Sequence, residues 1–339
     1  MKNRVQIENL ERKRKYKYDV SVMLLILAVL IIINMTLGSK NFSPTEVISV
    51  LFGKDVPGGT YIIGKLRFPR TIAAIICGYA FGIAGNTFQK LLGNPLASPD
   101  IIGVSTGSAA AAVFGILVLH ANRGVVSIMA IVAGLVTVLV IYLIAYKDGY
   151  STVRVILTGI GVQAFLSACI SWMLLRAAEY DVPAAMRWMA GNLNEVTMDY
   201  LWLVGLVIGV VSCVIAVLSE VQKILELGEQ HALILGVKVG TARVLLLACS
   251  VVMLAVATAV SGPISSIAFL SGPIAGGICG KNRSNTLASG IVGAILVIGA
   301  DFIGQNLLPT RYPVGVVSGV LGAPYLLYLL IRLNKGDHV

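Results

Sequence analysis

Residues 20–38 of the chain read VSVMLLILAVLIIINMTLG, an apolar run of 19 residues without a charged side chain. A helix needs about 20 predominantly apolar residues to cross the hydrocarbon core of a bilayer. The run follows a polar stretch, residues 1–19, with a basic cluster made of Arg12, Lys13, Arg14, Lys15 and Lys17. Signal peptides share this charge pattern, but the run is long and no small-x-small cleavage site closes it. We therefore predict an uncleaved first span, preceded by a cytoplasmic tail over residues 1–19.

The composition of the whole chain agrees with a membrane protein. Apolar residues make up 57% of the 339 positions, about 193 residues, and charged residues only 12%; the mean hydropathy is +0.88. A soluble fold of this size could not cover so much apolar surface with groups that water tolerates. The composition therefore excludes a soluble enzyme, a disordered chain and a nucleic-acid-binding protein. The net charge of +10 is then explained by basic residues retained on the cytoplasmic side of a membrane.

Nine further apolar stretches follow the first one, so the sequence predicts an all-α, polytopic protein with ten transmembrane helices. The predicted spans are 20–38, 67–92, 101–120, 124–146, 152–174, 200–219, 241–260, 263–280, 286–308 and 314–333. They form a single transmembrane domain over residues 20–333, followed by a short cytoplasmic tail at 334–339. With the N-terminus inside, 17 of the 26 lysines and arginines lie on the cytoplasmic side and 9 outside, the bias that the positive-inside rule requires.

Glycines spaced four residues apart recur in the predicted spans. The pairs are Gly78/Gly82, Gly103/Gly107, Gly205/Gly209, Gly276/Gly280 and Gly315/Gly319. Small residues one turn apart allow two helix backbones to approach closely in a bilayer. We interpret most of these pairs as packing positions of a tight helix bundle.

The motifs of catalysis and metal binding are missing from the sequence. His120, His231 and His338 have no spacing that a metal site would need, so we expect neither a metal nor a cofactor. The stretch 275–282 comes closest to a phosphate-binding loop, but it lacks the first glycine and the final Ser or Thr. ATP hydrolysis is therefore not expected in this chain. Asp301 is the clearest ionisable group within a span, and a structural pairing with Gln305 or with a neighbouring backbone is the simpler interpretation.

Two hydrophilic segments stand out against this apolar background. The first contains Arg67 and Arg70 around Pro69, predicted to form a cationic turn at the outer end of the second span, and Arg311 lies in another outer loop. Arginines are suited to bidentate pairing with carboxylates of a partner protein, although arginines at helix ends also snorkel to the membrane interface. The second segment, residues 220–240, is cytoplasmic and amphipathic, with glycines on both sides of a short helix. It is either a surface helix or a lever seated on a cytoplasmic motor.

Residues 67–110, RFPRTIAAIICGYAFGIAGNTFQKLLGNPLASPDIIGVSTGSAA, resemble the signature of the FecCD-type permeases. The resemblance continues through short motifs in the same order along the chain: 151–154 STVR, 157–159 LTG, 186–191 MRWMAG, 228–229 GE with 235–236 LG, 261–264 SGPI, 313–315 PVG and 321–324 LGAP. It covers the chain from about residue 40 to its end. Members of this family are the membrane subunits of ABC importers for ferric siderophores, haem and cobalamin.

The resemblance implies a set of partners and site residues. Family permeases pair as homo- or heterodimers, with two ATPase subunits beneath them and a substrate-binding protein docked outside, in the cytoplasmic membrane of bacteria. Arg67, Arg70 and Arg311 match outer arginines that receive the binding protein. The matching ATPase-coupling residues are Gly228, Glu229, Ala232, Leu235 and Gly236. Ser151 and Thr152 match a cytoplasmic gate, and we expect Asn94, Pro95, Ser105 and Gly107 to line the pathway.

One segment departs from the family pattern. Many members carry Pro-His followed by Arg after the Gly-Pro-Ile motif, whereas residues 269–277, FLSGPIAGG, contain neither a histidine nor an arginine. The leading hypothesis is a permease subunit of an ABC importer for an iron chelate, a ferric siderophore before haem or cobalamin. A secondary transporter driven by an ion gradient is the alternative, and an intramembrane enzyme lacks any catalytic constellation here.

Overall fold

The computed structural model describes residues 2–145, 152–194, 196–280 and 284–336, and over these the chain is a bundle of helices without a strand. Its elements, in order, are α1 (Lys2–Thr36), α2 (Pro44–Leu51), α3 (Gly59–Tyr61), the π-helical turn η1 (Ile62–Arg67), α4 (Phe68–Leu91), the 3-10 turn η2 (Pro99–Ile102), α5 (Val104–Leu117), α6 (Arg123–Ala145), α7 (Thr152–Arg176), α8 (Val182–Met189), α9 (Met198–Val217), α10 (Ser219–Glu226), α11 (Glu229–Ile234), α12 (Val239–Ser261), α13 (Ser265–Cys279), α14 (Thr286–Asn306) and α15 (Val314–Gly336).

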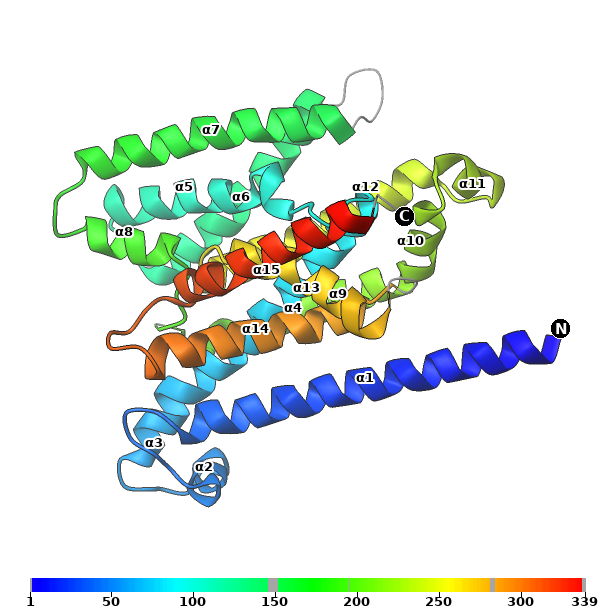
Figure 1. The fold of residues 1–339 in the computed structure, drawn as a ribbon. Coiled ribbons are helices and arrows are strands. Elements are labelled where there is room, and N and C mark those ends of the chain that lie inside the picture. The colour runs from blue at the N-terminus through cyan, green and yellow to red at the C-terminus, as the bar shows by residue number, and fades with distance from the viewer. Residues whose placement is uncertain (1, 146–151, 195, 281–283, 337–339) are drawn as a thin grey trace.

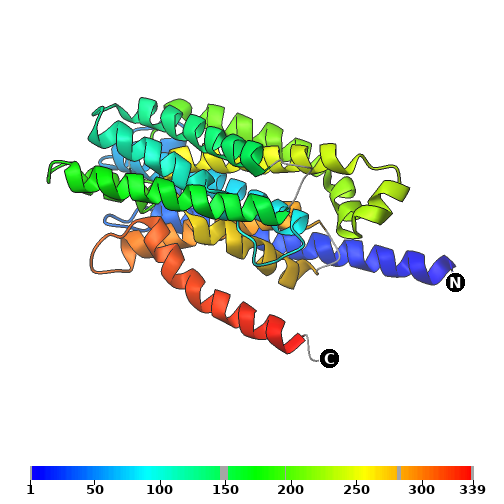
Figure 2. The same cartoon turned by 90° about the horizontal axis from the view of Figure 1, so that it is seen from above.

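The predicted ten-helix membrane fold is confirmed. Over the described residues, eight helices are long and apolar enough to cross a bilayer, and two shorter apolar helices lie at Val104–Leu117 and Ser266–Cys279. Each of these ten helices overlaps one predicted span. The start of α1, the end of α15 and the α10–α11 segment lie at one end of the bundle, which we call the terminal end (Figure 1 and Figure 2). The opposite end carries α2, α3, α8 and the loop between α14 and α15 (Figure 1).

The core of the bundle is built around α4. In the most apolar windows of α4, α12 and α14, 78%, 72% and 67% of the residues are buried, whereas the same share is 17–28% in α1, α6, α7, α9 and α15. Helix α4 packs against α12, α13 and α14, and its buried side includes many small residues. The outer helices therefore present apolar side chains away from the bundle, as lipid-facing helices do.

Glycines allow the closest helix contacts. A Cβ atom built at Gly82 would overlap the carbonyl oxygen of Ser289 in α14, and one at Gly85 would overlap the carbonyl oxygen of Ala268 in α13. The packing interpretation of Gly78/Gly82 is thus confirmed, because both residues lie against the backbone of α14. It is wrong for Gly209 and Gly319, where a Cβ would meet open space.

Two segments go beyond the sequence-based expectation or depart from it. Helix α1 begins at Lys2, so residues 2–19, which include the basic cluster, continue the predicted first span as part of one helix of 35 residues. At about 1.5 Å per residue this helix is about 52 Å long, well beyond the hydrocarbon core. The prediction of a turn fixed by Pro69 is wrong. Pro69 follows directly after the π-helical turn η1, inside a helical stretch that runs continuously from Gly59 to Leu91.

Candidate functional site

The α10–α11 segment follows α9 at the terminal end of the bundle. Two short helices form it, Ser219–Glu226 and Glu229–Ile234, where the sequence predicted a single one. The chain turns sharply at Gly228 with a φ of +102° and again at Gly236 with a φ of +79°. Backbones of this conformation favour glycine, because any Cβ would be strained there. The two predicted glycines therefore fix the directions in which α11 enters and leaves the segment.

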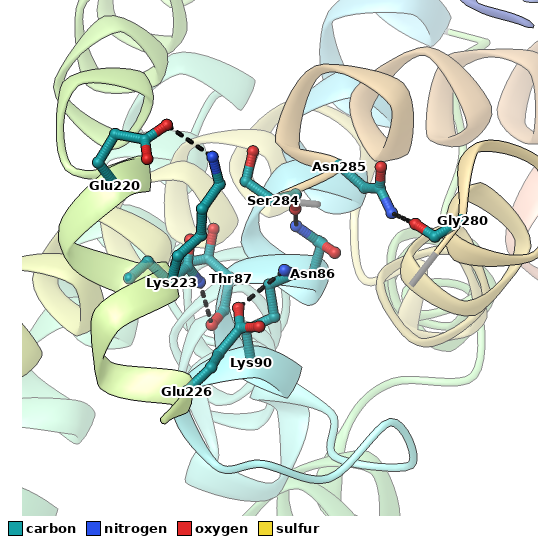
Figure 3. A network of polar contacts seen from close by, with 10 residues as sticks. Asn86, Thr87, Lys90, Glu220, Lys223, Glu226, Gly280, Ser284 and Asn285 are labelled. Carbon is teal, nitrogen blue, oxygen red and sulfur yellow. Dashed lines mark hydrogen bonds and ion pairs between the residues drawn. The ribbon is translucent and has the colours of Figure 1, made fainter. Parts of the chain in front are cut away.

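Helix α10 is anchored to the end of α4 by two polar contacts (Figure 3). The side chain of Gln222 is buried, and its Nε2 donates a hydrogen bond of 3.2 Å to the carbonyl oxygen of Thr87. Lys90 Nζ lies 2.8 Å from Glu226 Oε1 in an ion pair whose side chains are 14% and 34% exposed. A buried amide that bonds to a helix carbonyl holds the geometry of a contact more firmly than an exposed ion pair does. Movement of α10 is thereby tied to α4.

The same end of α4 also holds the α13–α14 connection (Figure 3). Asn86 Nδ2 donates to the carbonyl oxygen of Ser284 at 2.9 Å, and Asn285 Nδ2 donates to the carbonyl oxygen of Gly280 at 2.8 Å. One turn further along α4, Gln89 Nε2 donates to the carbonyl oxygen of Phe269 in α13 at 2.8 Å. Residues 86–90 thus join two segments that are far apart in the sequence.

Helix α11 turns an apolar surface away from the bundle. Ala232 is fully buried, whereas Leu233, Ile234 and Leu235 are 58%, 83% and 60% exposed. Glu229 Oε2 lies 3.0 Å from Nη1 of Arg243 in an ion pair that holds α11 to α12, the next span. The side chain of Glu229 remains 58% exposed in this pair. Contiguous apolar side chains at the tip of a helix bundle are typical of a protein interface.

The three predicted docking arginines lie at the opposite end, but two of them are engaged inside the chain. Arg67 donates to the carbonyl oxygens of Met35 at 2.9 Å and Thr36 at 3.1 Å, at the end of α1, and to that of Lys40 at 2.6 Å, in the loop after it. The two helix carbonyls lack helical partners, and a cation at a helix C-terminus is favoured by the macrodipole. Arg67 therefore has a structural role that the sequence did not reveal.

Arg70 forms an ion pair with the buried Asp301. Its Nε lies 3.5 Å from Asp301 Oδ1, and the two side chains are 19% and 2% exposed. The interpretation that Asp301 pairs with Gln305 is wrong, because Gln305 Nε2 donates instead to the carbonyl oxygen of Tyr312. Arg311, in the loop between α14 and α15, is exposed. Of the three arginines, Arg311 is the one whose side chain is most open to a partner.

The four predicted pathway residues do not share one surface. Asn94 and Pro95 are exposed, and Asn94 Oδ1 accepts a hydrogen bond of 2.8 Å from the Leu96 amide. Ser105 is buried and donates a short hydrogen bond to Asp100. Gly107 is buried against α6, where a Cβ would overlap Thr137. Within this chain, Ser105 and Gly107 are packing positions. The gate residue Ser151 and the side chain of Thr152 lie outside the described residues.

Asp100 is a titratable group in the loop between α4 and α5 whose pKa is shifted by its surroundings. It lies in η2, between the membrane-spanning helices α4 and α5, and burial raises the pKa of its carboxyl group. Hydrogen bonds from Ser105 and Ser98 oppose this shift, because they stabilise the carboxylate. The Asp100 carboxylate therefore joins Ser98 and Ser105 through hydrogen bonds, while its burial disfavours the charged form.

Comparison with known proteins assigns this arrangement to a family. The model of the FecCD transport family matches residues 26–332. The chain belongs to the FecCD transport family. It is 35% identical over 299 residues to the ferric enterobactin transport system permease protein FepG of Escherichia coli, a match that covers 88% of this chain and 91% of the other protein. It is 31% identical to the achromobactin transport system permease protein CbrC of Dickeya dadantii, and this match covers 89% of this chain and 87% of the other protein.

Solved structures extend the likeness of this FecCD chain to the fold. A chain from an inward-facing ABC transporter of the metal-chelate type superposes with a TM-score of 0.83 at 23% identity, covering 93% of this chain and 99% of the other. At this identity the match shows the shared ten-helix architecture. The eight long apolar helices and the membership of the FecCD family make the chain an integral, multi-pass membrane protein.

Proposed function

We propose that this chain is the permease subunit of a binding-protein-dependent ABC importer that carries a ferric siderophore inward across the bacterial cytoplasmic membrane. The single observation that carries this proposal is membership of the FecCD family over residues 26–332. Relatives with the names of ferric enterobactin and achromobactin permeases support an iron chelate as the substrate, ahead of haem or cobalamin. The charge bias of the loops supports a cytoplasmic terminal end.

The α10–α11 segment would then seat on the ATPase subunits, which supply the energy in separate chains. Its exposed surface of Leu233, Ile234 and Leu235 is apolar and lies beyond the spans, and Glu229 with Arg243 holds α11 to α12. Closure of two ATPase subunits would move α11. The contacts of Gln222 and of the Lys90–Glu226 pair would carry that movement to α4.

At the opposite end, the extracytoplasmic binding protein would dock with its carboxylates against Arg311. Arg67 and Arg70 shape the docking surface through the end of α1 and through Asp301, and any contact they make with the partner competes with these internal bonds. A second permease subunit, identical or related, completes the pathway. The selectivity for one chelate would lie mainly in the binding protein.

Reconstitution in liposomes tests the proposal. The permease is combined with its ATPase, ATP and binding protein, and uptake of a ferric siderophore into the liposomes is measured. We expect uptake only when all components are present. Uptake driven by a proton or sodium gradient alone would overturn the proposal in favour of a secondary transporter, and uptake of haem or cobalamin but not of iron chelates would change the substrate.

The coupling surface has its own test. Replacing Ile234 by aspartate, on the exposed tip of α11, should reduce copurification of the ATPase and abolish ATP-dependent uptake. The matched control is Leu119→Asp, because Leu119 is also apolar and 53% exposed but follows α5, at the end of the bundle opposite the α10–α11 segment. Equal ATPase recovery with both variants contradicts the assignment of α11.

A further inference from the structure

The start of helix α1 presents a group of cations to its surroundings. The basic cluster consists of Arg12, Lys13, Arg14, Lys15 and Lys17, and all five side chains are exposed. Among the described residues, none of the five forms an ion pair or a side-chain hydrogen bond. Residues 10–19 contain two carboxylates, those of Glu11 and Asp19, so this stretch keeps a net charge of +3. The basic cluster is therefore open to an anionic partner.

The basic cluster lies at the level where the surface of a bilayer meets the helix. The apolar run begins at Val20, so the cations from Lys17 back to Arg12 lie about 4.5–12 Å beyond it along the helix axis. The headgroup layer on each side of a bilayer is about 5–7 Å thick, and the field of anionic lipids extends about 8 Å further into water. Tyr18, which is 69% exposed, lies between the cluster and the run, where tyrosine is enriched in membrane proteins. All five cations are thus within reach of lipid headgroups.

The cations surround the helix instead of sharing one face of it. Successive residues of an α-helix are turned by about 100°, so the four basic residues 12–15 point to all sides. Helix α1 packs on α13 and α14 through one stripe, which contains Tyr16, Val20, Met23 and Leu27. Its start projects beyond α14 at the terminal end (Figure 1 and Figure 2). A protein partner would contact one side of such a helix, whereas lipid headgroups surround it, so the arrangement favours lipid.

We propose that the basic cluster is a binding site for the headgroups of anionic phospholipids, which fix the depth of α1 in the leaflet at the terminal end. Lysine and arginine side chains form charge-assisted hydrogen bonds with phosphate oxygens. The phosphate of phosphatidylglycerol carries a net negative charge, whereas the choline of phosphatidylcholine cancels that of its own phosphate. The site therefore selects anionic over zwitterionic lipids, whichever substrate the permease carries.

The affinity for single lipids tests the proposal. The full-length permease is purified in a neutral detergent without ATPase and titrated with phosphatidylglycerol or phosphatidylcholine that carries the same acyl chains. Native mass spectrometry resolves the lipid-bound states and gives the dissociation constant of each lipid. We expect the permease to bind phosphatidylglycerol more tightly. In a glutamine variant, with Arg14→Gln, Lys15→Gln and Lys17→Gln, this binding should be at least about tenfold weaker, because each cation near an anionic surface contributes about fivefold.

Two variants serve as matched controls. An exchange variant, with arginine for lysine and lysine for arginine at the same three positions, keeps the charge and should bind phosphatidylglycerol as tightly as the native protein. A second variant removes three exposed cations at the opposite end, with Lys54→Gln, Lys65→Gln and Arg176→Gln. It should leave the tightest binding of phosphatidylglycerol unchanged.

Several results would overturn the proposal. One is equal affinity of the native permease for the two lipids, and another is equal affinity of the glutamine and exchange variants for phosphatidylglycerol. Loss of ATPase copurification in the glutamine variant, without a change in lipid affinity, would assign the basic cluster to the ATPase instead. Should the glutamine variant fold poorly, the native protein decides, because its preference for phosphatidylglycerol must weaken as the ionic strength rises. A preference that does not depend on salt refutes the site.

Discussion

Replacement of Arg70 by glutamine should destabilise the protein severely, because it leaves the Asp301 carboxylate buried without a counter-charge. The two groups are 3.5 Å apart, and Asp301 is only 2% exposed. At that separation and an effective dielectric constant of about 20, the Coulomb attraction is about 5 kcal/mol. Loss of one partner of a buried pair costs about 3–5 kcal/mol in measured cases, which agrees with this value.

The double replacement tests whether the two groups interact. Asp301→Asn alone should cost less than Arg70→Gln, because Arg70 is partly exposed and retains some solvation. The variant that carries both changes should lose at least about 2 kcal/mol less than the sum of the single losses. Equilibrium unfolding of the purified protein in mixed micelles, titrated with SDS and followed by circular dichroism, gives each free energy of unfolding.

The exposed Arg311 provides the control for the stability measurements. Arg311→Gln, at the same end and exposed, should change the free energy of unfolding by no more than about 0.5 kcal/mol. Strict additivity of the Arg70 and Asp301 effects would refute the ion pair. Charge reversal at Arg70 would place two carboxylates side by side in the core, so loss of binding-protein affinity in such a variant would report misfolding. Arg311 is the residue at which docking can be tested cleanly.

Three smaller predictions use the same protein. Gly82→Ala should cost about 1–3 kcal/mol in the SDS titration through overpacking between α4 and α14, whereas Gly209→Ala, in open space, should not destabilise. Ser43→Ala removes the capping box of α2 and should lower its stability by about 1 kcal/mol, seen as faster amide hydrogen exchange in its first turn. Because burial raises the pKa of Asp100, the folded state holds its proton to higher pH than the unfolded state, and stability falls as the pH rises between the two pKa values. Asp100→Asn should remove this fall and be at least as stable as the native protein at pH 7, measured by thermal unfolding across that pH range.

Apolar runs made the spans predictable from the sequence. Helix α12, for example, covers Val239–Ser261 where the hydropathy indicated 241–260, because a bilayer demands long apolar stretches whatever their neighbours are. The short helices α2 and α8 escaped prediction, since eight amphipathic residues at an interface have no comparable signal. The apolar run marked only the membrane-spanning part of α1, because residues 2–19 are polar, although lysine, arginine and glutamate are good helix formers.

The residues of the candidate site were predicted from the family resemblance, whereas their contacts were not. Gly228 and Gly236 were named as coupling residues in this way, and both have positive φ angles, which favour glycine. The partners of Arg70 and of Thr87 could not be found in the same way. Asp301 and Gln222 are 231 and 135 residues away along the chain, and a single sequence holds no signal for which buried polar groups meet. Arg67 was predicted as an outer docking residue, and its bonds to backbone carbonyls could not be foreseen, because those carbonyls carry no side-chain signature.

Helix α4 links the two candidate ends physically. Arg70 and Lys90 lie 20 residues apart on it, which is about 30 Å along the helix axis. Between them, the backbone of α4 lies directly against that of α14 at Gly82 and against that of α13 at Gly85. No flexible side chains separate the helices at these two positions, so α4 cannot slide past its neighbours there. A displacement of α10, held by Lys90, must therefore move α4 with its neighbours as one body or break the Lys90–Glu226 contact. A partly exposed ion pair such as Lys90–Glu226 contributes only about 0.2–1 kcal/mol, so the hydrogen bond of the buried Gln222 has to carry the movement. We therefore expect Gln222→Leu to uncouple ATP hydrolysis from uptake. The variant Glu226→Gln should leave most of the coupling intact. Comparison of ATPase rate and uptake in the two variants decides the point, and equal uncoupling by both would contradict this division of roles.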